Sequence, residues 1–173
     1  TLLAMFDRHP LEEIILHPRT GIQMYQGTSD HDAFEKAIQS SRHPFTYNGD
    51  ILDLSSFKKV RDRFPSINRF MIGRGILSNP FLAEEIKGTP KNSTPRIERL
   101  KGFHDELFAE YDKIFSGPAH LAGRMKGFWT YLGPSLRDSR KPLKQILKAT
   151  SLPAYSDRVE AFFDQNLEFL PTP

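Results

Sequence analysis

Gly73, Arg74 and Gly75 follow an apolar run that ends at Ile72, and they carry the clearest chemical signal in the sequence. Glycine has no Cβ atom, so the backbone at these two positions can come close to a ligand. The guanidinium of Arg74 offers a planar set of donors that suits phosphate. Amides that follow a strand and open a helix also favour an anion. The pattern predicts a phosphate-binding strand end, although a tight turn with a surface arginine has the same sequence.

Two earlier apolar runs, at residues 14–16 and 45–47, also end in polar residues. The first leads into His17-Pro18-Arg19-Thr20. A neutral imidazole at His17 can hydrogen-bond a ring carbonyl or ring nitrogen, and Arg19 can hold an anion or a polarised carbonyl. The alternative is a histidine that bonds backbone groups and an arginine in a surface ion pair.

The second run leads into Asn48-Gly49-Asp50. Asp50 has two interpretations, a base or the cap of a helix or turn, and the general preference of aspartate for cap positions favours the cap. Because three strand ends carry polar groups, we expect one shared ligand site. The phosphate sites of (β/α)8 barrels follow the last two strands, which would make residues 48–50 and 73–75 those two loops.

The elements that position these residues alternate as far as residue 88. Strands are expected at 14–16, 45–47 and 69–72. Helices are expected after the cap Asp30, over residues 54–64, and from Asn79 to residue 86. Three consecutive β-then-α units predict an α/β fold with a parallel sheet of about three strands in residues 1–88.

The second half of the chain is predicted to be an all-α helical bundle over residues 96–173, joined by a linker at 89–95. Apolar residues at helical spacing indicate a long helix from residue 95 to about 114 and a second after Gly117-Pro118. A third is expected at about 135–148 and a last one at about 156–169.

Basic side chains gather between residues 124 and 148, where Asp138 is the only acid. Lys141, Lys144 and Lys148 share a face of the third predicted helix, and Arg137 lies four residues before Lys141. A basic stripe of this kind is typical of nucleic-acid binding, while the alternative is a solvated helix face. The candidate nucleic-acid-binding residues are Arg124, Lys126, Arg137, Arg140, Lys141, Lys144 and Lys148.

Composition narrows the classes of protein. The net charge is +3, 38% of residues are hydrophobic, and no apolar run reaches the length of a membrane span. The chain has no cysteine, which excludes a disulfide framework, a thiolate metal site or a cysteine nucleophile within it. We therefore expect a cytoplasmic protein without a membrane partner and without a metal site.

Taken together, the three strand ends resemble the tRNA-dihydrouridine synthase family. The resemblance rests on residues 16–20 with 23–27, on 47–51, and on 71–80, in this order and spacing. It extends through the helical part, with Arg124 and the neighbouring Trp129-Thr130-Tyr131, and covers about Leu11 to Lys148.

This resemblance implies that residues 1–88 are the C-terminal β/α units of a TIM barrel. It also implies an enzyme that holds FMN and uses NADPH to reduce a uridine of tRNA. By similarity, His17 contacts the flavin ring or the substrate side, and Arg19 lies nearby. Asn48, Gly49 and Asp50 line the ribityl and phosphate end, while Gly73 and Arg74 bind the phosphate. The target uracil must leave its stack to meet the flavin.

The resemblance also implies residues that this sequence lacks, above all a catalytic cysteine that donates a proton. The sequence begins within an apolar stretch, Leu2 to Phe6, typical of the end of a helix. We therefore expect a C-terminal portion of a synthase with no catalytic residue of its own, inactive alone and able to self-associate through exposed strand edges. Two alternatives remain open, another barrel oxidoreductase that binds FMN or phosphate, and a non-catalytic RNA-binding module.

Overall fold

The computed structural model describes residues 2–89, 93–165 and 167–170. The chain divides between Ile76 and Leu77 into two compact units, unit 1 over residues 1–76 and unit 2 over residues 77–172. This division places residues 77–88 with the helical unit, whereas the sequence analysis assigns them to the strand-rich part. The expected linker at 89–95 lies partly outside the described residues, and the domain boundaries of the whole protein stay a prediction.

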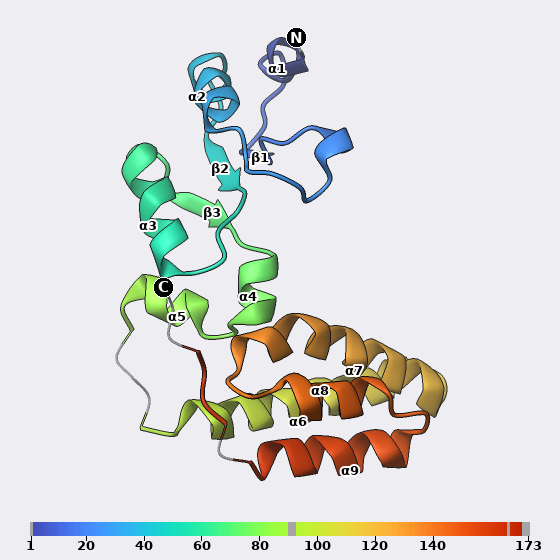
Figure 1. Cartoon of the computed structure of the whole chain (residues 1–173). Coiled ribbons are helices and arrows are strands. Elements are labelled where there is room, and N and C mark those ends of the chain that lie inside the picture. The colour runs from blue at the N-terminus through green and yellow to red at the C-terminus, as the bar shows by residue number, and fades with distance from the viewer. Residues whose placement is uncertain (1, 90–92, 166, 171–173) are drawn as a thin grey trace. The chain divides into compact units, whose positions relative to one another are not determined.

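Unit 1 is built around a three-stranded parallel sheet in the order β1-β2-β3 (Figure 1). Leu16 pairs with Tyr47, and Tyr47 pairs with Phe70, so the three carboxyl ends lie at one edge of the sheet. This confirms the three predicted parallel strands. The elements of unit 1 are α1 (Leu2–Phe6), β1 (Ile14–Leu16), η1 (Gly21–Gln23), α2 (His31–Gln39), β2 (Phe45–Asn48), α3 (Leu54–Arg63) and β3 (Arg69–Met71), and α4 (Arg74–Ser78) crosses the division.

Helices α2 and α3 cover one face of the sheet through aromatic side chains. Phe34 of α2 packs edge-on against Tyr47 of β2, with ring centroids 4.9 Å apart. Phe57 of α3 packs in the same way against Phe70 of β3 at 5.0 Å. The helices begin where the sequence analysis expects, because Asp30 caps α2 by accepting a hydrogen bond from the backbone N–H of Ala33 at 2.9 Å.

The opposite face of the sheet carries a polar row across all three strands, at their amino ends. One carboxylate oxygen of Glu13, just before β1, accepts hydrogen bonds from the Thr46 hydroxyl on β2 and from Arg69 on β3. These bonds lower the pKa of Glu13, so the row is an ionised cross-strand link. No local sequence pattern predicted this row.

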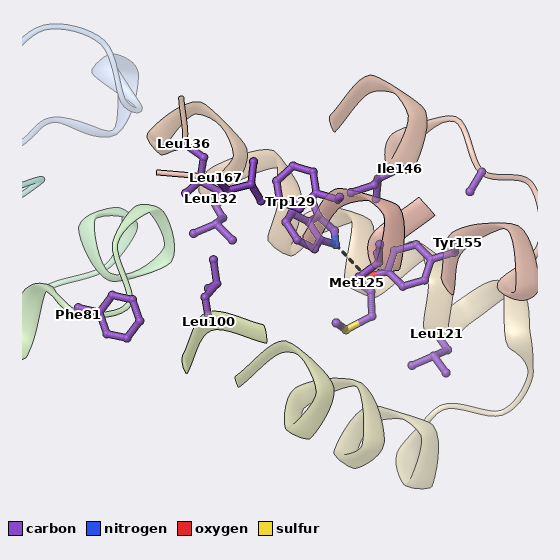
Figure 2. Close-up of a cluster of buried hydrophobic side chains, with 13 residues drawn as sticks. Phe81, Leu100, Leu121, Met125, Trp129, Leu132, Leu136, Ile146, Tyr155 and Leu167 are labelled. Atoms are coloured by element: carbon purple, nitrogen blue, oxygen red, sulfur yellow. Dashed lines mark hydrogen bonds between the residues drawn. The ribbon is translucent and has the colours of Figure 1, made fainter. Parts of the chain in front are cut away.

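Unit 2 is a helical bundle around the buried side chains that Figure 2 shows. Trp129 and Met125 of α7, Leu100 of α6, Ile146 of α8 and Tyr155 of α9 are all fully buried. In Figure 1 helices α6 to α9 lie alongside one another. The elements of unit 2 are α5 (Leu82–Lys87), α6 (Arg96–Ile114), α7 (Pro118–Leu132), η2 (Gly133–Ser135), α8 (Arg140–Leu147) and α9 (Leu152–Phe163). Within the described residues no helix combines the length and apolarity that crossing a membrane requires.

Two predicted helices of the bundle have different bounds. The helix expected at 135–148 begins only at Arg140, because Leu136 is extended and forms an antiparallel bridge with Phe169. Asp138 then adopts a φ of 53°, which interrupts any helix through this segment. Arg137 therefore does not belong to the helix face of Lys141, and that part of the prediction was wrong.

The helix expected at 156–169 is α9, which begins earlier and ends earlier. The Ser151 hydroxyl caps α9 by accepting a hydrogen bond from the backbone N–H of Ala154. The helix ends at Phe163, and Phe169 lies in the antiparallel bridge with Leu136. The helix expected from Asn79 to residue 86 is α5, which begins only at Leu82, and the separate short helix α4 ends before Asn79. The Asn79 side chain holds the turn between them by accepting a hydrogen bond from the Phe81 N–H at 3.1 Å.

Candidate functional site

The carboxyl ends of the three strands bring the predicted residues of unit 1 together around one carboxylate. The side chain of Asp50, after β2, contacts Arg19, after β1, through Nη2 at 2.7 Å and Nη1 at 3.2 Å. It also contacts Arg74, after β3, through Nη2 at 3.0 Å. The structure therefore brings Asp50, Arg19 and Arg74 together, and a ligand site shared by the three strand ends stays a prediction.

Asp50 is not the cap that the sequence favoured. The N-cap of α3 is Asp53, whose carboxylate accepts a hydrogen bond from the Ser56 N–H at 2.7 Å. Burial opposes ionisation of Asp50, but hydrogen bonds from Ser29 and Arg19 outweigh it and lower the pKa of the carboxyl group. An ionised carboxylate between two guanidinium groups is a poor base, so Asp50 fits neither of its two sequence interpretations.

Arg19 is buried, with 2% of its side chain exposed, and it also donates from Nη2 to the carbonyl of Gly27 at 2.8 Å. The alternative interpretation of Arg19 was an arginine in a surface ion pair. Arg19 does form an ion pair, with Asp50, but its side chain is buried. Arg74 keeps 35% of its side chain exposed, and its guanidinium lies 4.5 Å from the centre of the Tyr25 ring. Of the two arginines, Arg74 is the one that an anion can reach.

The remaining predicted residues differ in how they are held. The Nε2 atom of His17 is buried without a hydrogen-bond partner among the described residues, as is Nε of Arg19. The side-chain amide of Asn48 lies 3.5 Å from the sulfur of Met71 on the neighbouring strand. Gly73 is exposed, and a Cβ atom there would meet no atom within 4 Å. There is thus open space beside Gly73, next in sequence to Arg74.

Gly49 is required for a packing reason. A Cβ atom at this position would lie 2.3 Å from the Tyr47 hydroxyl, and Tyr47 is fully buried. That hydroxyl shares a hydrogen bond of 3.1 Å with Nε2 of His31, and burial raises the pKa of Tyr47, so the group stays a neutral phenol. The glycine lets the chain turn directly over the tyrosine and deliver Asp50 to the arginines.

Sequence reasoning missed Ser29. Its backbone N–H and its hydroxyl both donate to Oδ2 of Asp50, at 2.9 and 3.0 Å. Ser29 precedes the α2 cap Asp30, so its sequence context indicates only the start of a helix. Its partner is 21 positions away, which no local pattern reveals.

The basic residues of unit 2 separate into two groups. Four exposed side chains on or beside α8 make no ion pair within the part of the chain that the structure describes: Arg140, Lys141, Lys144 and Lys148. The other three have partners in unit 2. Arg137 forms an ion pair with Glu168 at 3.3 Å, and Nζ of Lys126 donates a hydrogen bond to the carbonyl of Ala149. The guanidinium carbon of Arg124 lies 5.4 Å from the centre of the Phe115 ring.

No group of metal-ligating side chains occurs among residues 2–89, 93–165 and 167–170.

The chain is similar to the dihydrouridine synthase family, whose model matches residues 4–116. It is 28% identical over 161 residues to a probable tRNA-dihydrouridine synthase of Rhodobacter capsulatus, covering 92% of this chain and 46% of that protein. It is 26% identical over 160 residues to tRNA-dihydrouridine synthase B of Vibrio vulnificus, covering 86% and 49%. A probable tRNA-dihydrouridine synthase of Staphylococcus epidermidis is 26% identical over 164 residues, covering 90% and 48%.

The family match spans more than half of the chain, and the chain belongs to the dihydrouridine synthase family. This confirms the resemblance read from the three strand ends, and it does not favour the two alternatives, a different barrel oxidoreductase or a non-catalytic RNA-binding module. The chain spans about half the length of the curated relatives it matches.

Proposed function

We propose that this chain forms the C-terminal portion of a tRNA-dihydrouridine synthase, which reduces a uridine of tRNA with FMN and NADPH. Unit 1 then supplies the last β/α units of a (β/α)8 barrel, and unit 2 contributes to tRNA binding. The observation that carries the proposal is the convergence of Arg19, Asp50 and Arg74 at three parallel strand ends in a member of this family. Ligands of parallel α/β sheets bind at this edge.

The residues present fit the phosphate end of a flavin nucleotide. Arg74 is accessible and cationic, the position beside Gly73 is open, and Nε2 of His17 lacks a partner among the described residues. Arg74 and Gly73 would hold the phosphate, while Asn48, Gly49 and His17 would lie towards the rest of the flavin. Bound FMN would supply the hydride chemistry that links NADPH to the uracil ring. The residues of this chain bind and orient, and the proton-donating cysteine comes from the rest of the synthase.

The test of the flavin site is Arg74→Ala in the complete synthase. A charged hydrogen bond contributes about 1.5–3 kcal/mol, so FMN affinity should fall by roughly one to two decades. The matched control is Arg63→Ala, because Arg63 is a partly exposed arginine that pairs with Asp32 and Glu35 and lies over the Phe64 ring. Flavin content after purification and a fluorescence titration give the result. Equal affinity in wild type and Arg74→Ala would remove Arg74 from the site.

We propose that three exposed lysines on α8 and directly after it bind the tRNA backbone. Lys141, Lys144 and Lys148 recur at helical spacing, and no acidic side chain is paired with them among the described residues. Each lost phosphate contact should flatten the slope of log affinity against log salt by about 0.7–0.9. Replacing all three by serine should therefore reduce the slope by roughly 2–3 in tRNA titrations.

The control for the tRNA experiment replaces Lys36, Lys58 and Lys59, three exposed lysines of unit 1, by serine. This variant removes the same formal charge, so it measures the effect of net charge alone. Equal slopes for the α8 variant and this control would mean that α8 presents only a solvated face. FMN binding should be the same in both variants, because neither set lies at the strand ends.

We further propose that the chain on its own is inactive and self-associates. The outer edges of β1 and β3 make no strand pairing within the described residues, and unpaired edges are templates for pairing. Sedimentation velocity over a range of concentrations measures this association. A monomer at every concentration would contradict the proposal.

A further inference from the structure

The carboxylate of Asp50 joins three separate segments of unit 1. Oδ1 accepts from Arg19 and Arg74, and Oδ2 accepts from Arg19 and from the backbone and hydroxyl of Ser29. Arg19 follows β1, Ser29 precedes α2, and Arg74 follows β3. The donors thus occupy both oxygens, and the carboxylate has a fixed orientation.

The two Nη groups of Arg19 are directed at protein groups in this arrangement. Its side chain is 2% exposed, and its two Nη groups are bonded to Asp50 and to the carbonyl of Gly27. Its charge is compensated by the carboxylate, which satisfies the general requirement that a buried ion be paired. The cluster of two arginines and one aspartate retains one net positive charge, and the exposed member that presents it is Arg74.

Arg74 is held on two sides. Its Nη2 donates to Asp50 at 3.0 Å, and its guanidinium lies against the ring of Tyr25 at 4.5 Å. Its Nε and Nη1 make no hydrogen bond with any other residue in the described ranges. A guanidinium clamped in this way loses less conformational entropy when it binds an anion than a free arginine side chain does.

We propose that Asp50 is a positioning residue for Arg74: anchored by Arg19 and Ser29, its carboxylate fixes the guanidinium against Tyr25 and leaves the remaining donors of Arg74 for a phosphate. This inference rests on the proposed function of Arg74. The competing interpretation is that Asp50 merely neutralises Arg74 and competes with an incoming anion. The two predict opposite signs, because removing the carboxylate weakens phosphate binding in the first case and strengthens it in the second.

The first experiment needs no ligand and uses the chain itself. The chain is treated with p-hydroxyphenylglyoxal, and modification of each arginine is followed by peptide mass spectrometry. In Asp50→Asn the rate at Arg74 should rise at least about tenfold, the lower end of the range for one charge-assisted hydrogen bond. Rates at Arg124 and Arg140 of unit 2 should not change. The matched control is Asp32→Asn, which removes a surface carboxylate paired with Arg63 and should leave Arg74 as in wild type.

Asp50→Asn also leaves Arg19 buried without its carboxylate, which can unfold unit 1. A second variant, Arg19→Gln with Asp50→Asn, removes both charges together and should show the same rise at Arg74. An unchanged rate at Arg74 in folded variants overturns the inference. Unfolding of both variants also overturns it, because the carboxylate is then needed for the fold and not for the placement of Arg74.

The second experiment measures, in the complete synthase, how much tighter FMN binds than riboflavin, which lacks the phosphate. Asp50→Asn should lower this preference about tenfold, the same factor as above. If Arg74→Ala leaves the preference unchanged, the proposed function of Arg74 fails, whatever Asp50 does. If Arg74→Ala abolishes the preference while Asp50→Asn preserves or raises it, the positioning role alone is refuted.

Discussion

Tyr155→Phe tests whether a buried polar chain holds unit 2 together. The Tyr155 hydroxyl accepts a hydrogen bond from Nε1 of Trp129 at 2.9 Å, drawn dashed in Figure 2, and shares another of 2.8 Å with Nε2 of His104. Nδ1 of His104 lies 2.9 Å from the carboxylate of Asp105. A neutral imidazole with its proton on Nδ1 satisfies the whole chain, since it donates to Asp105 and accepts from the tyrosine.

The magnitude follows from the groups that the substitution leaves without partners. Trp129 and Tyr155 are 0% exposed and His104 is 4% exposed. Each buried polar group left unpaired costs about 1–3 kcal/mol, so two cost about 2–6 kcal/mol. The lower half of this range is expected, because His104 borders a surface pocket of about 310 Å³ from which water can reach it. A loss of about 2 kcal/mol lowers the melting temperature by at least about 8 °C in a unit of this size.

The assay is urea unfolding followed by fluorescence. Trp129 is the only tryptophan of the chain, so its emission reports unit 2 alone. The matched control is Tyr131→Phe, because Tyr131 is 44% exposed and its hydroxyl has no hydrogen-bond partner within the described residues. A free energy of unfolding for Tyr155→Phe within about 0.5 kcal/mol of this control would refute the reasoning, since that is the usual effect of a surface substitution.

Three further predictions concern pH, packing and capping. Burial lowers the pKa of His104 from its ordinary 6.5, against the opposing effect of Asp105, so the folded state favours the neutral ring. Unit 2 should therefore be most stable above pH 6.5 and lose stability as the pH falls towards the lowered pKa. His104→Gln should flatten this pH dependence of the free energy of unfolding, measured by urea titrations at several pH values. Gly49→Ala should destabilise unit 1 by about 1–3 kcal/mol by circular dichroism, while Gly21→Ala, where a Cβ meets nothing within 4 Å, should have a much smaller effect. Asp53→Ala should cost unit 1 about 1 kcal/mol in the same assay, and no change would mean that water replaces the lost cap.

The local elements of this chain were predictable where the hydrophobic period and a cap agreed. The cap Asp30 predicted the start of α2, on which Phe34 and Ala37 are buried, and the apolar run at 45–47 predicted β2. The prediction failed over residues 136–139, where the chain forms the bridge between Leu136 and Phe169 and a turn in place of a helix. That bridge joins residues far apart in sequence, so no window of local pattern contains it.

The same limit applies to the candidate site. The polar strand ends identified Arg19, Asp50 and Arg74 as members of one region, because parallel strands end at one edge. Their roles relative to one another were not predictable, since Arg19 and Asp50 are 31 positions apart and a pattern of residue types does not say which cation a carboxylate binds. Whether these residues bind FMN stays a prediction.

The polar row of Glu13, Thr46 and Arg69 gives the sheet two ends with different tolerance to substitution. The row lies at the amino ends of the strands, where it joins them to each other. The candidate ligand groups lie at the opposite, carboxyl ends. Variation among relatives at the first end should therefore track the temperature at which each protein works, while variation at the second should track what each protein binds. A sequence library randomised separately at the two ends would sort into fold-stability and ligand-binding phenotypes with little overlap.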